Sequence, residues 1–439
     1  MTIINSNVLV TPNHFIGLLL LCVSCTQQNA DKIHDSVVLN SHDLAVLSIV
    51  ADSIDLWGDS VGVYVKGVGN SSNWQGQKAN YFSGKKIQID LAYYVDGRQV
   101  LRQEAGLKVS GGGSRKQPQK SFNIFSDEQF SYPFFKQKQL TDFSHFRLRV
   151  SGQDWRETLL RDALMHALVS ETAIDAQAYQ PVVVYLNGNY WGVYNLREKF
   201  NARYLEQNHG VGRCDILERN GKLRKGDTLH YQQMLRFIEK HDLAVDSHYQ
   251  QVLAWVDTDN FMDYYCAQIY FANTDWPGNN VKYWRPRTET GKWRWFIHDT
   301  DLGFGFAPIW GHPGGVEHNT LKYALNDSAT MHHNPIWSTF MFRNLLKNTQ
   351  FKQEFIRKFA QHLQTTFQPK RVHEVIDSLS AVIAPEMPQH IERWKKTAPY
   401  ALQSMEQWGW QLQELKDFAT KRPAIVEKQL QEQFNLKEE

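Results

Sequence analysis

Asp275-Trp-Pro-Gly-Asn-Asn280, followed by Asp299-Thr-Asp301, is the most informative part of this chain. Between these two pieces lie Val281-Lys-Tyr-Trp-Arg285 and Trp293-Arg-Trp-Phe-Ile-His298, whose composition predicts the two strands of a β-hairpin. The first strand begins directly after Asn280, and the second ends directly before Asp299. We therefore expect the hairpin to bring an acid, an amide and a further acid pair to one place.

Acid and amide oxygens in this pattern suit a divalent cation, because Mg²⁺ prefers hard oxygen ligands. Protein kinases use the same spacing: an Asp beside the acceptor hydroxyl, an Asn five residues later that holds the metal, and then a metal-binding Asp. The alternative is a helix-ending turn in which Asp275, Pro277, Gly278 and the asparagines serve only turn geometry. The acid pair Asp299 and Asp301, with glycines shortly after it, favours the cation site.

Composition limits the classes of protein that fit. A chain of 439 residues predicts two or three sub-domains, and 42% hydrophobic with 21% charged residues is typical of a soluble globular protein. The formal net charge of +2, with no basic stripe, gives no electrostatic case for nucleic acid. The 14 Trp, 18 Tyr and 24 Phe suit either stacked ligands, such as nucleobases and sugars, or bulky core packing.

The N-terminus has the pattern of a targeting signal. The apolar run from Phe15 to Cys25 is too short to span a bilayer and is similar to a bacterial lipoprotein signal, in which Cys25 is lipidated. A basic n-region is missing and Cys22 stands where Leu or Val is usual, so a buried N-terminal helix is the alternative. We expect a signal peptide at 1–25, a polar tether at 26–50, and anchoring in the bacterial cell envelope. Cys214 and Cys266 then form either one disulfide or two buried thiols.

Hydrophobic periodicity predicts an α+β protein, with a β-rich N-terminal lobe, a mainly helical C-terminal lobe, and the polar motifs at the seam. Asp96-Gly97 and Asn187-Gly188 are strong signals for tight turns between strands. No internal repeat and no further membrane-spanning segment is evident. The predicted strands are 61–66, 87–94, 121–125, 181–186 and 191–196, and the predicted helices are 156–170, 228–241, 248–256, 259–272 and most of 335–434.

A glycine-rich segment, Ser110-Gly-Gly-Gly-Ser-Arg115, precedes Lys120. Backbone N–H groups in such a turn can cradle phosphate, with Lys or Arg as countercharge. Lys120 begins a strand, as a kinase phosphate-binding lysine does, and Glu198 is a candidate partner for it. The alternative for the glycine-rich segment is a flexible turn with solvated charges. The alternative for Glu198 is an acid at the surface. We interpret Arg161-Asp162 as a structural network.

Taken in order, these motifs resemble the CotH family, the spore-coat-protein-H-type kinases, over about residues 105–310. The resemblance implies an atypical protein-kinase-like fold that uses ATP with a divalent metal to phosphorylate serines on coat proteins. The matching pieces are Gly112-Gly-Ser-Arg115, Pro118-Gln-Lys-Ser-Phe122, Leu160-Arg-Asp-Ala163, Tyr185 to Tyr194 with Glu198, Asn273-Thr-Asp275-Trp276 with Asn279-Asn280, and Asp299-Thr-Asp301.

By position, the resemblance implies that Asp275 is the catalytic acid of the loop. It also implies that Asn280, Asp299 and Asp301 hold Mg²⁺ or Mn²⁺, and that Lys120, Arg115 and Glu198 serve the nucleotide. His298 stands where the family often has Trp. The implied domains are a β-rich N-terminal region at 51–104, the kinase-like core at 105–310 and a helical C-terminal region at 311–439.

The sequence thus predicts transfer of the γ-phosphoryl group of ATP to serine on a secreted or surface protein. The alternative is a non-catalytic cell-surface binding protein, an adhesin lipoprotein that keeps the kinase-like fold. Scarce ATP outside the inner membrane and the aromatic content favour that alternative. A third hypothesis is different phosphoryl or nucleotidyl chemistry at the same metal site.

Overall fold

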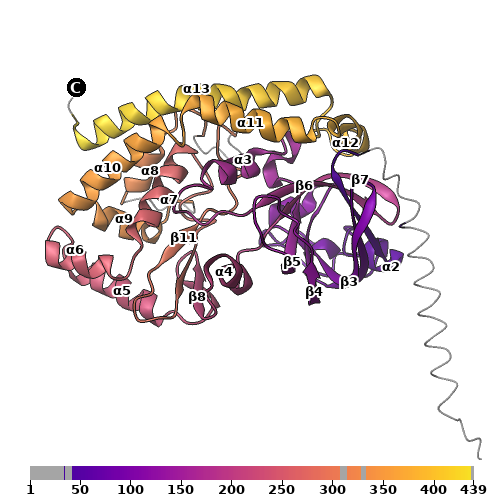
Figure 1. Cartoon of the computed structure of the whole chain (residues 1–439), viewed down its shortest axis with the longest axis horizontal. Coiled ribbons are helices and arrows are strands. Elements are labelled where there is room, and N and C mark those ends of the chain that lie inside the picture. The colour runs from indigo at the N-terminus through magenta and orange to yellow at the C-terminus, as the bar shows by residue number, and fades with distance from the viewer. Residues whose placement is uncertain (1–33, 35–41, 307–313, 328–332, 437–439) are drawn as a thin grey trace, which may run out of the picture.

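The computed structural model describes residues 34, 42–306, 314–327 and 333–436. Within these ranges a barrel of strands, indigo to purple in Figure 1, lies beside a mainly helical part, and the long helix α13 extends along both. The predicted α+β class is confirmed by this mixture of elements. The expected signal peptide at 1–25, with Cys25, lies outside the described residues.

Seven strands close the barrel in the order β1-β2-β3-β4-β5-β7-β6. Neighbouring strands are antiparallel, except that β1 and β6 run parallel where the barrel closes. The strands are β1 Ala45–Ala51, β2 Ile87–Val95, β3 Arg98–Ser110, β4 Ser121–Ser131, β5 Asp142–Arg149, β6 Tyr179–Leu186 and β7 Asn189–Arg197.

Strand β1 corrects the expected tether at 26–50. Leu47 and Ile49 are fully buried in the barrel core, and Leu47 is level with Tyr93 of β2 and Val184 of β6. Local composition did not reveal this strand, because the partner that closes the barrel, β6, lies far along the chain. The expected boundary between 104 and 105 is also wrong, because it falls inside β3.

The tight turns predicted from sequence are confirmed. Asp96 and Gly97 join β2 to β3 with φ of 50° and 72°, and Asn187 and Gly188 join β6 to β7 with φ of 48° and 75°. Left-handed backbone at both central positions matches the twist of the flanking strands, which is why Asp-Gly and Asn-Gly mark hairpins. The strand predicted at 61–66 is wrong: this segment is irregular, although Val63 and Tyr64 pack against the barrel core.

A second, antiparallel sheet has the order β11-β10-β8-β9 and lies in the helical part. Strands β10 and β11, at one edge of this sheet, are the hairpin predicted around the acid and amide motifs, with Tyr283 level with Trp295. That prediction is confirmed. The strands are β8 Cys214–Glu218, β9 Lys222–Lys225, β10 Lys282–Pro286 and β11 Arg294–Phe296.

The helices predicted after Asp227 are confirmed, with small shifts in their bounds. The helix predicted at 156–170 begins only at Arg161, because 152–156 forms a 3₁₀ turn. The helices are α2 Ser53–Trp57, α3 Arg161–Leu168, α4 Ala202–His209, α5 Leu229–Lys240, α6 Asp246–Leu253, α7 Thr258–Tyr270, α8 Thr320–Leu325, α9 Phe340–Leu345, α10 Thr349–Gln364, α11 Pro369–Ile383, α12 Met387–Trp394 and α13 Met405–Phe434.

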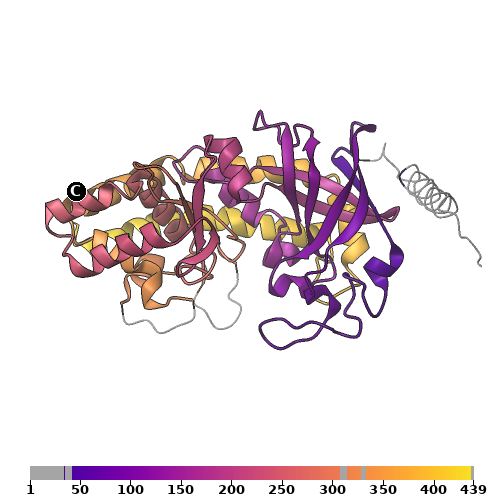
Figure 2. The same cartoon turned by 90° about the horizontal axis from the view of Figure 1, so that it is seen from below.

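The C-terminal helices lie against the barrel (Figures 1 and 2), and apolar side chains join the two parts. Val183 of β6 and Val193 of β7 belong to one buried cluster with Ile383 of α11, Met387 of α12 and Trp408 of α13. The outer faces of these strands are therefore buried as well as their inner faces. This explains why 181–186 reads as a continuous apolar run instead of an alternating one.

Cys214 and Cys266 are both buried and unbonded, so the structure decides for two thiols. Across the described ranges, every helix is too short or too polar to cross a membrane.

The burial of β1 predicts that Ile49→Ala destabilises the protein by about 2–5 kcal/mol, as expected for a large-to-small change in a core. Urea unfolding measures this effect. Asp43→Ala, at an exposed position just before β1, is the matched control and should be neutral. If 42–50 were a tether, the two variants would be equally stable.

Candidate active site

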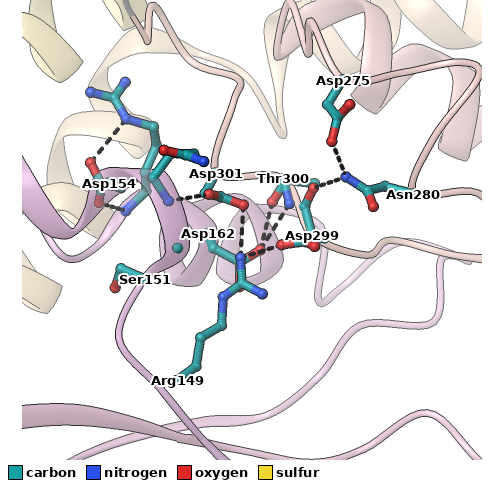
Figure 3. Close-up of polar contacts among 12 residues, drawn as sticks. Arg149, Ser151, Asp154, Asp162, Asp275, Asn280, Asp299, Thr300 and Asp301 are labelled. Carbon is teal, nitrogen blue, oxygen red and sulfur yellow. Dashed lines mark hydrogen bonds and ion pairs between the residues drawn. The ribbon is translucent and has the colours of Figure 1, made fainter. Parts of the chain in front are cut away.

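Arg149, at the end of β5, is the centre of a cluster of acids (Figure 3). Its Nη2 donates to Asp301 Oδ1 at 2.8 Å and also to the carboxylate of Asp299. Its Nε lies 3.5 Å from Asp162 Oδ2. One guanidinium thus joins the barrel to helix α3 and to the loop that follows β11.

Asp162 fixes that loop from the other side. Its Oδ1 accepts from the Thr300 backbone N–H at 2.9 Å and from the Thr300 hydroxyl at 3.1 Å, while Oδ2 lies 3.3 Å from Arg197 Nη2. Burial opposes the charge on this carboxyl, but the guanidinium groups of Arg149 and Arg197 hold the pKa of Asp162 well below its usual range. The network predicted for Arg161-Asp162 is therefore present, and it borders the site.

Arg161 makes a second clamp on the same loop. Its Nε donates to Asp154 Oδ1 at 3.1 Å, and Nη1 donates to the carbonyl oxygen of Phe304. Asp154 is fully buried and also accepts from the backbone N–H of Arg161 at 2.9 Å, at the start of α3. The acid loop is thus held at Thr300 and again at Phe304.

Both carboxylate oxygens of Asp301 have hydrogen-bond partners within the protein. Oδ1 faces Arg149, and Oδ2 accepts from the Gln153 backbone N–H at 2.5 Å. Gly152 allows this approach: its φ is +59°, and a Cβ there would lie 2.3 Å from Asp301 Oδ2. Burial, and then the negative charge of Asp299, raise the pKa of Asp301 well above its usual range.

Asp299 is the more open acid, with 35% of its side chain exposed. Burial opposes its ionisation, but the positive charge of Arg149 prevails and lowers the pKa of Asp299 below its usual range. Its φ of 54° is left-handed, a conformation that Asp tolerates better than most residues and that is enriched at functional sites. An ionised carboxylate is thereby presented at the surface of the cluster.

Asn280 links this acid to Asp275 (Figure 3). Its Nδ2 donates to Asp275 Oδ2 at 2.7 Å and to the backbone carbonyl oxygen of Asp299 at 3.2 Å. Asp275 Oδ1 accepts from Asn279 Nδ2 at 2.9 Å and lies 3.1 Å from His333 Nδ1. The structure thus brings together Asp275, Asn280 and Asp299, as their spacing predicted.

The structure does not pair Lys120 with Glu198, and this expectation is corrected. Glu198 Oε2 accepts from Lys138 Nζ at 2.6 Å and from the Ala178 backbone N–H at 2.7 Å. Strand register explains the separation. Phe122 is level with Leu148 and Leu148 with Leu196, so Lys120 is level with residue 194. Glu198 lies four residues farther along, roughly 13 Å.

Lys120 and Arg115 instead support the glycine-rich segment. Lys120 is 4% exposed, and its Nζ donates to the carbonyl oxygens of Arg115 at 2.7 Å and Gln117 at 2.9 Å. It lies 4.2 Å from the centre of the Tyr81 ring. Burial lowers the pKa of Lys120 to about 7. Arg115 Nε donates to the Gly111 carbonyl oxygen at 2.6 Å. The printed contacts of both cations are thus within the barrel and its loop, and neither pairs with Asp299.

The donor set fits a divalent cation at Asp299 and Asn280. No group of three or more His, Cys, Asp or Glu suited to a metal is found within the described residues. Mg²⁺ does not require one, since it is usually held by one or two carboxylates together with waters and substrate phosphates. Asp299 supplies an ionised carboxylate and Asn280 a neighbouring amide. Asp301 has both oxygens engaged and fits less well.

Sequence reasoning missed Arg149 and His333. Arg149 stands in an ordinary strand pattern, and His333 lies 58 residues after the acid it contacts, so neither has a local signal.

An α+β protein with this acid and amide constellation is of the kinase-like class. The family model described as CotH kinase protein matches residues 107–426, so the chain belongs to the CotH family. No curated protein sequence matches the chain. Among solved structures, the chain is similar to the Helicobacter pylori proinflammatory kinase CtkA, with 9% identity and a TM-score of 0.32, over 81% of this chain and 95% of that chain. So low a TM-score carries no argument about fold or function.

The ion pair of Glu198 predicts a coupling that a double-mutant cycle can measure. Glu198→Gln and Lys138→Met should couple by about 0.5–3 kcal/mol in unfolding free energy, because the side chains are in contact. Glu198→Gln and Lys120→Met should be additive within about 0.5 kcal/mol. If Glu198 coupled to Lys120 instead, the result would contradict the separation of these two residues and support the kinase-like pairing.

Gly152→Ala should destabilise the protein by more than about 2 kcal/mol, because it combines a left-handed backbone with a clash at Asp301 Oδ2. Gly113→Ala is the matched control, since Gly113 has no positive φ and no atom within 4 Å of an added Cβ. Thermal unfolding of both variants measures the difference. Equal melting temperatures would show that Asp301 does not pack against Gly152.

Proposed function

We propose that this protein is an ATP- and metal-dependent phosphotransferase that phosphorylates serine on a secreted or surface protein. The observation that carries the proposal is the pair of hydrogen bonds from Asn280 to Asp275 and to the Asp299 backbone, in a chain of the CotH family. These bonds hold a half-buried acid and an ionised, accessible acid on the two sides of one amide.

Asp275 is the residue placed to act on the acceptor hydroxyl. Its side chain is 23% exposed, and Asn279, Asn280 and His333 hold its two oxygens. Fixed in this way, the carboxylate orients the serine hydroxyl and accepts its proton as the phosphoryl group transfers. Positioning and electrostatics supply most of the catalysis in such reactions.

Asp299 and Asn280 would hold the Mg²⁺ or Mn²⁺, which neutralises charge on the phosphates when it is bound. Arg149 favours the ionised form of Asp299 that this role requires. Asp162 and Asp301 keep the loop in place through Thr300, Gln153 and Arg149. The buried cations Lys120 and Arg115 organise the glycine-rich segment, and Glu198 with Lys138 supports the barrel near α4.

The sequence of the leader supports a proposal about where in the cell this reaction occurs. We propose that the chain is anchored by a lipid on Cys25 in the bacterial cell envelope, where its acceptor protein is also located. Mass spectrometry of the mature N-terminus tests the anchor. A diacylglyceryl-modified Cys25 is expected, and an unmodified residue 25 would contradict it.

Asp275→Asn should lower phosphoryl transfer by about 10²–10⁴-fold while Mg-ATP still binds, because the variant loses the proton acceptor and keeps the shape. Asp299→Asn should abolish metal-dependent nucleotide binding as well. Transfer of labelled γ-phosphate to a surface-protein fraction and calorimetry measure the two effects. Asp377→Asn, whose acid lies on α11 in the C-terminal helices, is the control.

Full activity in both site variants would overturn this assignment. If the wild type shows no stabilisation by Mg-ATP or Mn-ATP but is stabilised by glycans, the non-catalytic surface binder is the better description. Mass spectrometry of the product distinguishes phosphoryl from nucleotidyl transfer.

A further inference from the structure

We infer that Arg147, Lys199 and Lys282 form a polyphosphate-binding strip beside Asp299, and that this strip receives the phosphate chain of the nucleotide. The side chains of Lys120 and Arg115 are already engaged by backbone carbonyl oxygens, so other cations are needed beside Asp299. The identity of the ligand rests on the proposed function. The location of the strip rests on the register of the strands.

Three strand ends place the cations together. Arg147 lies two residues before Arg149 on β5, so it shares the face that leads to Asp299, and it is level with Arg197 of β7. Lys199 lies two residues after the end of β7. Lys282 begins β10, and its Nζ donates to the backbone carbonyl oxygen of Phe200 at 3.1 Å, beside Lys199.

The strip has more positive than negative charge. Arg147, Lys199 and Lys282 form no ion pair with a described carboxylate, and Arg147 is oriented by a 3.1 Å hydrogen bond from Nε to Ser110 Oγ. The neighbouring groups are the cations Lys86 and Lys108 and three acids that are already paired: Glu218 with Arg224, and Asp299 and Asp162 with Arg149. Burial, and then the charges of Arg147, Lys108 and Lys86, lower the pKa of Lys199.

These cations are half-buried, repel one another and have no carboxylate of the described residues paired with them. Their positive charge is therefore suited to binding an anionic ligand. A polyphosphate matches the arrangement, because Lys acts as a point charge toward phosphate and Arg as a two-pronged donor. The strip also begins at the cation position. Arg147 lies two residues before Arg149, which donates to the Asp299 carboxylate, and Lys282 follows Asn280 by two residues. A polyphosphate chain whose terminal phosphates lie at Asp299 would place its remaining phosphates on the strip.

Calorimetry with Mg-tripolyphosphate and with Mg-ATP tests the strip. We expect Arg147→Gln/Lys199→Gln to bind both ligands at least 10-fold more weakly than the wild type, with a smaller dependence on salt. Lys282→Gln alone should weaken binding severalfold. Arg98→Gln and Lys370→Gln remove exposed cations elsewhere and should bind as the wild type does. Melting temperatures equal to that of the wild type show that the variants are folded.

Wild-type affinity in the double variant would overturn the inference, and so would a wild type that binds neither ligand. An acidic acceptor is the competing occupant: unchanged Mg-ATP binding with a raised KM for the acceptor protein would assign the strip to it. The proposed function fails separately. A wild type that transfers no phosphate, yet binds tripolyphosphate through these cations, would refute the transfer and support the strip.

Discussion

The contact of one guanidinium with three carboxylates is the interaction on which the rest of the site depends. Arg149 belongs to the barrel, Asp162 to α3, and Asp299 and Asp301 to the loop after β11. Removing charges from water is costly unless they are paired and hydrogen-bonded. The cluster therefore requires the barrel, the helix and the loop to meet in one arrangement. That arrangement leaves Asp299 ionised and accessible, while Asp301 and Asp162 are enclosed.

Around this contact the two acids after β11 have different environments although only Thr300 separates them. Asp301 is enclosed by Gly152, Gln153 and Arg149, and burial with a neighbouring negative charge raises its pKa. Asp299 lies at the opening, and the Arg149 charge lowers its pKa. Environments that move two carboxyl pKa values apart are typical of sites with chemical roles. The difference supports Asp299 over Asp301 as the acid that meets a cation.

Much of the fold was predictable from sequence, where local rules apply. The Asp-Gly and Asn-Gly turns, the hairpin of β10 and β11, and the helices after Asp227 all follow from periodicity and turn chemistry, and all are present. The predictions from sequence are wrong where the conformation of a segment depends on residues far along the chain. Strand β1 was assigned to a tether because its partner β6 lies far along the chain. Segment 61–66 alternates like a strand, yet it packs on the core without joining the sheet.

That Asp275, Asn280 and Asp299 meet follows from the order of residues, because a hairpin that starts after one motif and ends before the other returns the chain to the same place. The family likewise follows from the sequence, through motifs in a fixed order. Which charges surround these residues depends instead on how the strands and helices pack. Arg149 and His333 reach the site from other elements, and strand register separates Lys120 from Glu198. Charge acts through space, so the partners of an acid depend on how strands and helices pack.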